Sequence, residues 1–157
     1  MINFYNQNNS YSITNEEHLS IWIERVLVRE GKKVGNINYI FVDDKSIIET
    51  NIKYLGHNYP TDIISFDTSE YSENIENSDN TFLSNNNIIS GDIFISTETI
   101  DYNSKQFKVP FEVEFRRVLI HGILHLIGYD DHKQDEIKMM RLKENESLQI
   151  WVDLKLD

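Results

Sequence analysis

The sequence predicts an α/β domain, in the broad sense that includes α+β folds, with a small mixed β-sheet layered with about five helices. Segments rich in β-branched and aromatic residues alternate along the chain with segments of helical periodicity, and a helix separates the first predicted strands. The length of 157 residues suits one domain, and no linker, repeat or heptad pattern divides it. We therefore expect residues 1–157 to form a single domain.

Five segments have the apolar spacing and the end signals of helices. The first begins with a capping box, Thr14 followed by Glu17, and ends at Gly31. The fourth begins after Pro110, which is tolerated at helix starts, and ends at Gly128. The predicted helices are residues 14–30, 46–55, 97–106, 111–127 and 134–151.

Three segments have the composition of strands: residues 36–43, 62–67 and 88–96. The first is apolar on both faces, with Ile37 and Phe41 on one side and Ile40 on the other, which predicts an inner strand. Residues 68–87 are rich in Ser, Asn, Asp and Glu, and we expect a mobile loop or a loose hairpin there. The order of the strands cannot be read from these patterns.

The composition limits the chemistry and the partners. Fifteen Lys and Arg residues against 26 Asp and Glu give a formal net charge of −11. Such a chain is poorly suited to non-specific binding of nucleic acid, so any RNA-binding surface must be locally basic. Most basic residues fit solvated helix faces; the candidates for such a surface are Arg25, Arg29, Lys32, Lys33, Lys105, Lys108, Arg116 and Arg117.

Two further absences in the sequence shape what we expect. There is no cysteine, so a metal ion must be bound by His, Asp or Glu. The first residues, MINFYNQNNSYS, lack a basic region followed by an apolar run, and no segment approaches the roughly 18 to 20 apolar residues that span a bilayer. We expect a cytoplasmic protein without a membrane partner.

The segment HGILHLIGYDDH, residues 121–132, carries the clearest chemical signal. Residues four apart lie on the same face of a helix, so His121 and His125 can direct two imidazoles at one metal ion. Gly128 turns the chain after the helix, which allows Asp131 or His132 to complete the site. Three protein ligands with one open position are typical of a catalytic zinc site.

Two histidines on an apolar helix also fit a simpler interpretation, in which they are core residues hydrogen-bonded to the backbone. Three observations favour metal binding. Three of the five histidines lie in this twelve-residue segment, and a glycine closely follows the helix. Asp130 and Asp131 lie beside the third position, where carboxylates commonly orient metal-binding histidines.

These residues resemble the signature of the YbeY family of endoribonucleases, H-G-x-L-H-L-x-G-Y-D followed by His. The resemblance extends upstream to FVDD at residues 41–44, PTDIISF at 60–66 and GDIFIS at 91–96, in the family's order. It continues downstream into the Met-bearing acidic helix after Lys133. Most of residues 36–150 is covered.

The resemblance implies a function and a set of site residues. It implies a metzincin-like zinc site on a central helix, with one Zn²⁺ per chain bound by His121, His125 and His132. It also implies single-strand-specific endoribonuclease activity in 16S rRNA 3′-end maturation and ribosome quality control. The implied partners are single-stranded rRNA and the small ribosomal subunit with its proteins; we expect no DNA partner. We expect His121, His125 and Asp130 to take part in catalysis.

The chain departs from the family pattern at two positions. The family has five residues between the second and third histidines, whereas six separate His125 from His132, so Asp131 occupies the family register. We favour His132 after a one-residue bulge, because imidazole suits zinc, with Asp131 as the alternative. Leu55 stands where many members carry an arginine that is suited to phosphate binding. Either another cation such as Lys53 replaces it, or this branch of the family relies less on the arginine, or the activity is reduced.

The expected mechanism follows from a metal-activated water attacking phosphorus in RNA. Gly122 replaces the glutamate of H-E-x-x-H enzymes, so Asp130 or Asp131 is the candidate general base, unless either only orients a ligand. Attack by the 2′-hydroxyl of the RNA is equally compatible. Two rival functions remain: a metalloprotease or other metal-dependent hydrolase, and a ribosome assembly or binding factor with a mainly structural metal.

Overall fold

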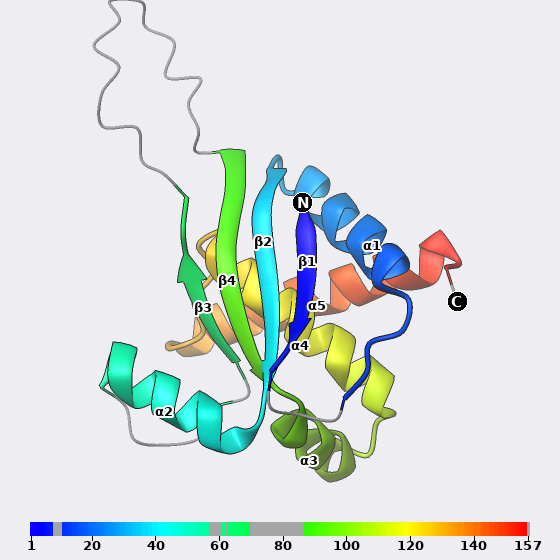
Figure 1. The fold of residues 1–157 in the computed structure, drawn as a ribbon. Coiled ribbons are helices and arrows are strands. Elements are labelled where there is room, and N and C mark those ends of the chain that lie inside the picture. Colours follow the sequence, from blue (N-terminus) through cyan, green and yellow to red (C-terminus); the bar gives the residue numbers. More distant parts are fainter. Residues whose placement is uncertain (8–10, 57–60, 62, 70–86, 157) are drawn as a thin grey trace, which may run out of the picture.

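The computed structural model describes residues 1–7, 11–56, 61, 63–69 and 87–156. Four strands form one sheet in the order β1-β2-β4-β3 (Figure 1). The three strands β1, β2 and β4 run parallel, and β3 runs antiparallel to β4, so the sheet is mixed as predicted. The strands are β1 Ile2–Asn6, β2 Lys33–Val42, β3 Ile63–Asp67 and β4 Ile88–Ser96.

The five predicted helices are confirmed, with bounds within a few residues of those expected. They are α1 Glu16–Arg29, α2 Asp44–Leu55, α3 Thr97–Phe107, α4 Phe111–Leu126 and α5 Gln134–Leu154. Helices α1, α4 and α5 cover one face of the sheet (Figure 1). Helix α2 packs against the other face through Ile47. Most of the predicted loop at 68–87 lies outside the described residues.

The two apolar faces of β2 explain this layered arrangement. Ile37, Tyr39 and Phe41 face the larger core, which α1, α4 and α5 complete. Ile40 and Val42 face the smaller cluster beneath α2. Because β2 is paired on both sides and buried on both faces, the prediction of an inner strand is confirmed.

Two local features differ from the sequence expectations. Strand β1 was not predicted; it pairs with β2 from Ile2 opposite Ile37 to Asn6 opposite Phe41. The prediction of a capping box at Thr14 is wrong, because α1 begins at Glu16 and its N-cap residue is Asn15. Asn15 has a left-handed φ of 65°, and its side chain makes no capping hydrogen bond. Asparagine tolerates this conformation better than most residues, so the chain enters α1 through a turn instead.

Gly122 brings α4 close to the sheet at the level of the histidine pair. A Cβ atom at this position would lie 2.7 Å from Cδ1 of Ile63 in β3 and 2.9 Å from Cγ2 of Ile93 in β4. The Ser65 hydroxyl also donates to the Gly122 carbonyl at 3.3 Å. The helix face that carries Gly122 therefore packs directly against β3 and β4.

Candidate metal centre

Three ligand atoms converge where α4 ends. His121 and His125 lie one turn apart on α4, with their Nε2 atoms 2.9 Å apart. The Oδ2 atom of Asp131 lies 3.3 Å from Nε2 of His121 and 3.6 Å from Nε2 of His125. Among the described residues, this is the group of His, Asp and Glu side chains whose geometry suits a metal ion.

The turn after α4 returns Asp131 to the histidine pair. Gly128 has a φ of 103°, a conformation that side-chain-bearing residues rarely adopt. The N–H of Gly128 donates to the carbonyl of His125 at 3.1 Å, and the N–H of Tyr129 donates to the carbonyl of Leu124 at 3.0 Å. These bonds close the helix end and direct the next residues back across it.

The dimensions of this group fit a zinc ion. Ligands at about 2.0–2.1 Å from a tetrahedral Zn²⁺ lie about 3.3–3.4 Å from one another. The observed separations of 2.9, 3.3 and 3.6 Å fall on both sides of this value. Two imidazoles and one carboxylate are also a donor set that catalytic zinc sites use, with a fourth position open for water or substrate.

His132, the favoured third ligand in the sequence analysis, is placed outside this group. Its side chain is exposed, and its N–H donates to Oε2 of Glu136 at 3.1 Å. Glu136 also accepts from the N–H of Lys133 at 3.2 Å, in the capping box that begins α5. The backbone of His132 is thus held at the start of α5. The side chain of the alternative, Asp131, lies with the two histidines. Which of these two residues binds a metal ion stays a prediction.

Asp130, the predicted general base, also lies outside the ligand group. It is exposed and lines a second pocket with Gly128, Tyr129 and residues of the first turns of α5. Its charge acts on His125, whose pKa it tends to raise. A role for Asp130 in proton transfer stays a prediction.

The surroundings of His125 favour its neutral form. Burial lowers the pKa of His125 below its usual value of 6.5, and the neighbouring His121 lowers it further. Asp131, a hydrogen bond with the backbone of Tyr129, and Asp130 oppose this shift without reversing it. A histidine must be neutral to bind a metal ion, so this environment prepares His125 as a ligand.

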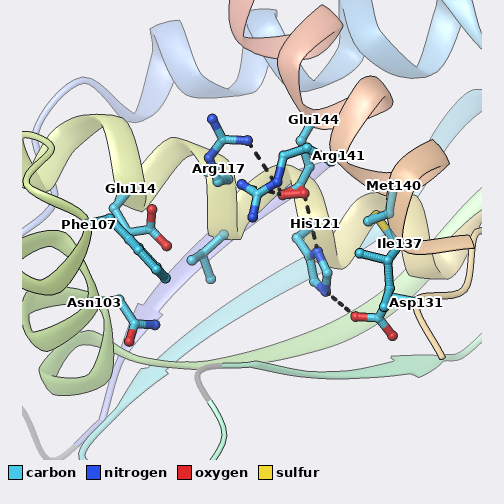
Figure 2. A pocket seen from close by; sticks show the side chains of 11 residues that line it. Asn103, Phe107, Glu114, Arg117, His121, Asp131, Ile137, Met140, Arg141 and Glu144 are labelled. Carbon is cyan, nitrogen blue, oxygen red and sulfur yellow. Dashed lines mark ion pairs between the residues drawn. The ribbon is translucent and has the colours of Figure 1, made fainter. Parts of the chain in front are cut away.

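Glu144 of α5 lies on the other side of the His121 ring from Asp131 (Figure 2). Its side chain is only 6% exposed, and its Oε2 atom is 3.8 Å from Nδ1 of His121. Its Oε1 atom lies 3.7 Å from the NH1 nitrogen of Arg117 and 3.8 Å from the NH1 nitrogen of Arg141. Carboxylates commonly orient metal-binding histidines through the nitrogen that does not bind the metal. Glu144 is placed for this role.

Sequence reasoning missed Glu144, although a signal was present. Met140, Glu144, Ser147 and Trp151 follow one another at helical spacing and form the buried stripe of α5. A carboxylate on a buried stripe needs charged or hydrogen-bonding partners, so Glu144 could have been singled out. Two of its partners, Arg117 and His121, lie on α4, and this pairing of helices is not readable from either segment alone.

The candidate ligands open into a pocket of about 380 Å³ between α3, α4 and α5 (Figure 2). His121 and Asp131 lie at one end, while Asn103 and Phe107 of α3 line the other. Neither Leu55 nor Lys53 is among its lining residues. Leu55 ends α2, and the Lys53 ammonium lies 5.1 Å from the centroid of the Tyr54 ring.

None of the helices in the described part of the chain combines the length and hydropathy needed to cross a bilayer.

Comparisons with known proteins identify the family of the chain. The family model described as Endoribonuclease YbeY matches residues 3–152. Endoribonuclease YbeY of Flavobacterium johnsoniae is 42% identical over 151 residues, covering 96% of this chain and 97% of that protein. The Endoribonuclease YbeY of Bacteroides fragilis is 43% identical over 127 residues, which is 81% of each chain.

A solved structure agrees with these matches. The solution structure of a protein from Thermotoga maritima superposes with a TM-score of 0.63 at 26% sequence identity. The superposition covers 99% of this chain and 92% of that protein. The chain belongs to the YbeY family of metal-dependent endoribonucleases.

Proposed function

We propose that this protein is a zinc-dependent, single-strand-specific endoribonuclease that acts in 16S rRNA 3′-end maturation and ribosome quality control. One observation supports this above all: His121, His125 and Asp131 converge in a chain of the YbeY family, and two of them, His121 and Asp131, line one end of a pocket. On this proposal the substrates are single-stranded regions of rRNA, and the small ribosomal subunit is the partner.

The proposed ligands of one zinc ion are His121, His125 and Asp131. We favour Asp131 over His132 as the third ligand, because its carboxylate lies close to both histidine nitrogens, whereas the N–H of His132 donates to Glu136 at the start of α5. Oε2 of Glu144 lies 3.8 Å from Nδ1 of His121, and on this proposal its negative charge attracts the N–H at Nδ1 and leaves Nε2 to face the ion. Burial lowers the pKa of His125, which favours the neutral imidazole that a metal ion binds.

When bound, zinc lowers the pKa of a water molecule toward neutrality and polarises a phosphate oxygen. The chain itself supplies the orientation of the ligands and an open side toward the pocket. Gly122 faces the sheet and offers no carboxylate. Asp130, exposed near His125, is therefore the proposed proton acceptor from outside the ligand group.

The test is metal analysis combined with RNA cleavage. Wild type, His125→Ala, Asp131→Ala and His132→Ala are purified, reconstituted with Zn²⁺ and assayed for zinc content and for cleavage of single-stranded and hairpin rRNA fragments. We expect about one zinc per chain in wild type and in His132→Ala, with cleavage confined to single-stranded regions. His125→Ala and Asp131→Ala lose both zinc and cleavage, while circular dichroism shows that they fold.

Each contrary result has a defined meaning. Loss of zinc in His132→Ala with retention in Asp131→Ala would restore the three-histidine site. Stoichiometric zinc in a wild-type protein that cleaves no RNA would favour an assembly factor with a structural metal. Wild-type protein that binds no metal after reconstitution would refute the proposal.

A further inference from the structure

The pocket beside the metal centre contains two guanidinium groups that no role described so far requires. Arg117 projects from α4 and Arg141 from α5, and both line the pocket with His121 and Asp131 (Figure 2). The carboxylate of Glu144 lies between them and His121. Both cationic side chains therefore lie near the proposed metal ligand His121, with only the Glu144 carboxylate between them.

Arg141 is the more available of the two cations. Its side chain is 58% exposed, and its guanidinium lies 3.8 Å from Oε1 of Glu144. That separation is too long for a hydrogen bond, and the structure shows no hydrogen bond from Arg141 to any described residue. A guanidinium has five N–H donors arranged to match phosphate oxygens, so Arg141 offers a complete donor set to a ligand.

Arg117 lies deeper and is partly engaged. Its side chain is 20% exposed, its NH1 donates to Oδ1 of Asn145 at 3.0 Å, and Oε1 of Glu144 is 3.7 Å away. These contacts hold the guanidinium in place with most of its donors unused. Arg117 is thus the more buried of the two cations and is held by Asn145, whereas Arg141 is the more exposed.

The charges lining the pocket make anion binding depend on the metal. The two arginines stand against three carboxylates, those of Glu114, Asp131 and Glu144, which leaves one formal negative charge. A divalent cation on the candidate ligands changes this to one positive charge. A phosphodiester is therefore attracted to the pocket of the zinc-loaded protein and not to that of the metal-free protein.

The end of the pocket farthest from the ligands carries an aromatic ring. Phe107, in the last turn of α3, is 62% exposed, and Asn103 lies one turn before it. Exposed aromatic rings beside cationic side chains are the usual means of binding single-stranded nucleic acid, because a base stacks on the ring while the cation binds the backbone. A paired base cannot present its face in this way.

We propose that Arg141 and Arg117 bind a backbone phosphate of single-stranded RNA next to the bond that is cleaved, while the adjacent base stacks on Phe107. This inference rests on the proposed nuclease function, since it assigns the substrate side of that same site. It makes the pocket between α3, α4 and α5 the RNA path of a protein whose overall charge repels RNA. It also explains the proposed preference for single-stranded over double-stranded RNA, because only an unpaired base can stack on Phe107.

The experiment measures RNA binding apart from cleavage. Zinc-loaded wild type, Arg141→Ala, Arg141→Lys, Phe107→Ala and Phe107→Trp are titrated into a short fluorescein-labelled single-stranded RNA, and anisotropy is recorded. The RNA carries 2′-O-methyl riboses and phosphorothioate linkages, so that it resists cleavage and the experiment measures binding alone. Electrophoresis confirms that the RNA is intact at the end of each titration. Arg25→Ala is the matched control, because it removes the same charge from an exposed position on α1 that does not line the pocket.

We expect Arg141→Ala and Phe107→Ala each to weaken binding about tenfold, with much of the affinity kept in Arg141→Lys and Phe107→Trp. For Arg141→Ala, the slope of log affinity against log salt concentration becomes shallower by about 0.7, as for the loss of one phosphate contact to a single strand. Arg25→Ala binds as wild type does. Metal-free wild type binds at least about tenfold more weakly than zinc-loaded protein.

Two results would overturn the inference while leaving the nuclease proposal intact. In the first, zinc-loaded wild type cleaves RNA, and Arg141→Ala binds and cleaves it equally well. In the second, Arg141→Ala loses zinc, which would mean that Arg141 acts through Glu144 on His121 and not on RNA. By contrast, wild type that binds zinc and single-stranded RNA without cleaving it would refute the nuclease function and retain the binding site.

Discussion

Gly122 occupies the position that carries a glutamate in H-E-x-x-H zinc enzymes, and its surroundings explain the difference. A Cβ atom there would meet Ile63 and Ile93 at 2.7 and 2.9 Å, so the position faces the sheet and not the ligand group. A glutamate at this point would place a carboxylate in the core without a partner. On the proposed function, a general base comes from another part of the chain or is not used.

Gly122→Ala tests this close approach. Alanine favours a helix over glycine by about 1 kcal/mol, whereas overpacking costs about 1–3 kcal/mol. Because the contacts involve a β-branched residue of the central strand β4, we expect overpacking to exceed the helix gain and to lower the unfolding free energy by up to about 2 kcal/mol. Urea unfolding of the zinc-free protein measures this change. An increase in stability would show that α4 can move away from the sheet.

The lowered pKa of His125 predicts a pH-dependent stability of the metal-free protein. In the unfolded chain this imidazole takes up a proton near pH 6.5, but in the folded protein burial and His121 hold its pKa lower. The unfolded state therefore binds more protons as pH falls below about 6.5, so the contribution of neutral His125 to stability is complete above that pH and declines below it.

The measurement compares wild type with His125→Gln. Urea unfolding of both metal-free proteins at pH 7.5 and 5.5 is expected to show a larger loss of stability in wild type over this interval. A loss of equal size in His125→Gln would show that other groups are responsible. Zinc steepens the pH dependence of wild type, because metal and proton compete for the same nitrogen.

The metal centre could be predicted from the sequence only as far as helical geometry reaches. Spacing alone places His121 and His125 together, because i and i+4 share a helix face. The choice between Asp131 and His132 depends on the turn at Gly128 and on the capping box of α5, which have no periodic signature. Arg141 contributes to the site through the packing of α5 on α4, which is a property of the folded chain.

At the scale of elements, the turn that carries Asp131 is tied to α1 and α5. The Tyr129 hydroxyl donates to Oε2 of Glu30 at 2.9 Å, and the Lys143 ammonium lies 2.9 Å from Oε1 of the same carboxylate. Burial raises the pKa of Glu30, but the hydrogen bonds from Lys143 and Tyr129 outweigh this and lower it below 4.5. The three elements are thus joined by one ionised carboxylate.

Glu30→Gln tests the contribution of this charge. The stability that ionised Glu30 provides is present above about pH 4.5 and is lost as pH falls through the lowered folded-state pKa. We expect Glu30→Gln to be less stable than wild type by about 1 kcal/mol at pH 7, with the difference shrinking toward pH 3. Glu24→Gln, at an exposed position of the same helix, is the control. A difference that persists unchanged at pH 3 would contradict this account.

The elements that the sequence predicts are those with a strong apolar pattern. Strand β1 was missed because its sequence, INFYN, contains two asparagines and only one edge of it is paired. The structure shows why a polar residue suits it: the Asn3 amide donates to Asn38, and the Asn38 amide donates to Asp92, both at 2.9 Å. This row of side chains across β1, β2 and β4 exists only after the strands have paired.

For the whole molecule, the net charge of −11 and the proposed phosphate contacts act in opposite directions on RNA. A basic nucleic-acid-binding protein neutralises many phosphates and loses affinity steeply as salt concentration rises. Here the proposed contacts are two guanidiniums beside the metal ion, and the rest of the surface repels RNA. Salt screens that repulsion as well as the attraction, so the two effects partly cancel.

This balance predicts a shallow salt dependence for zinc-loaded wild type. Two phosphate contacts to a single strand give a slope of log affinity against log salt concentration of about −1.4, and relief of the general repulsion makes the slope shallower still. Anisotropy titrations over roughly 50 to 200 mM salt, at constant zinc concentration, measure this slope. A slope steeper than about −4 would require an extended basic surface, and would move the RNA path away from the pocket between α3, α4 and α5.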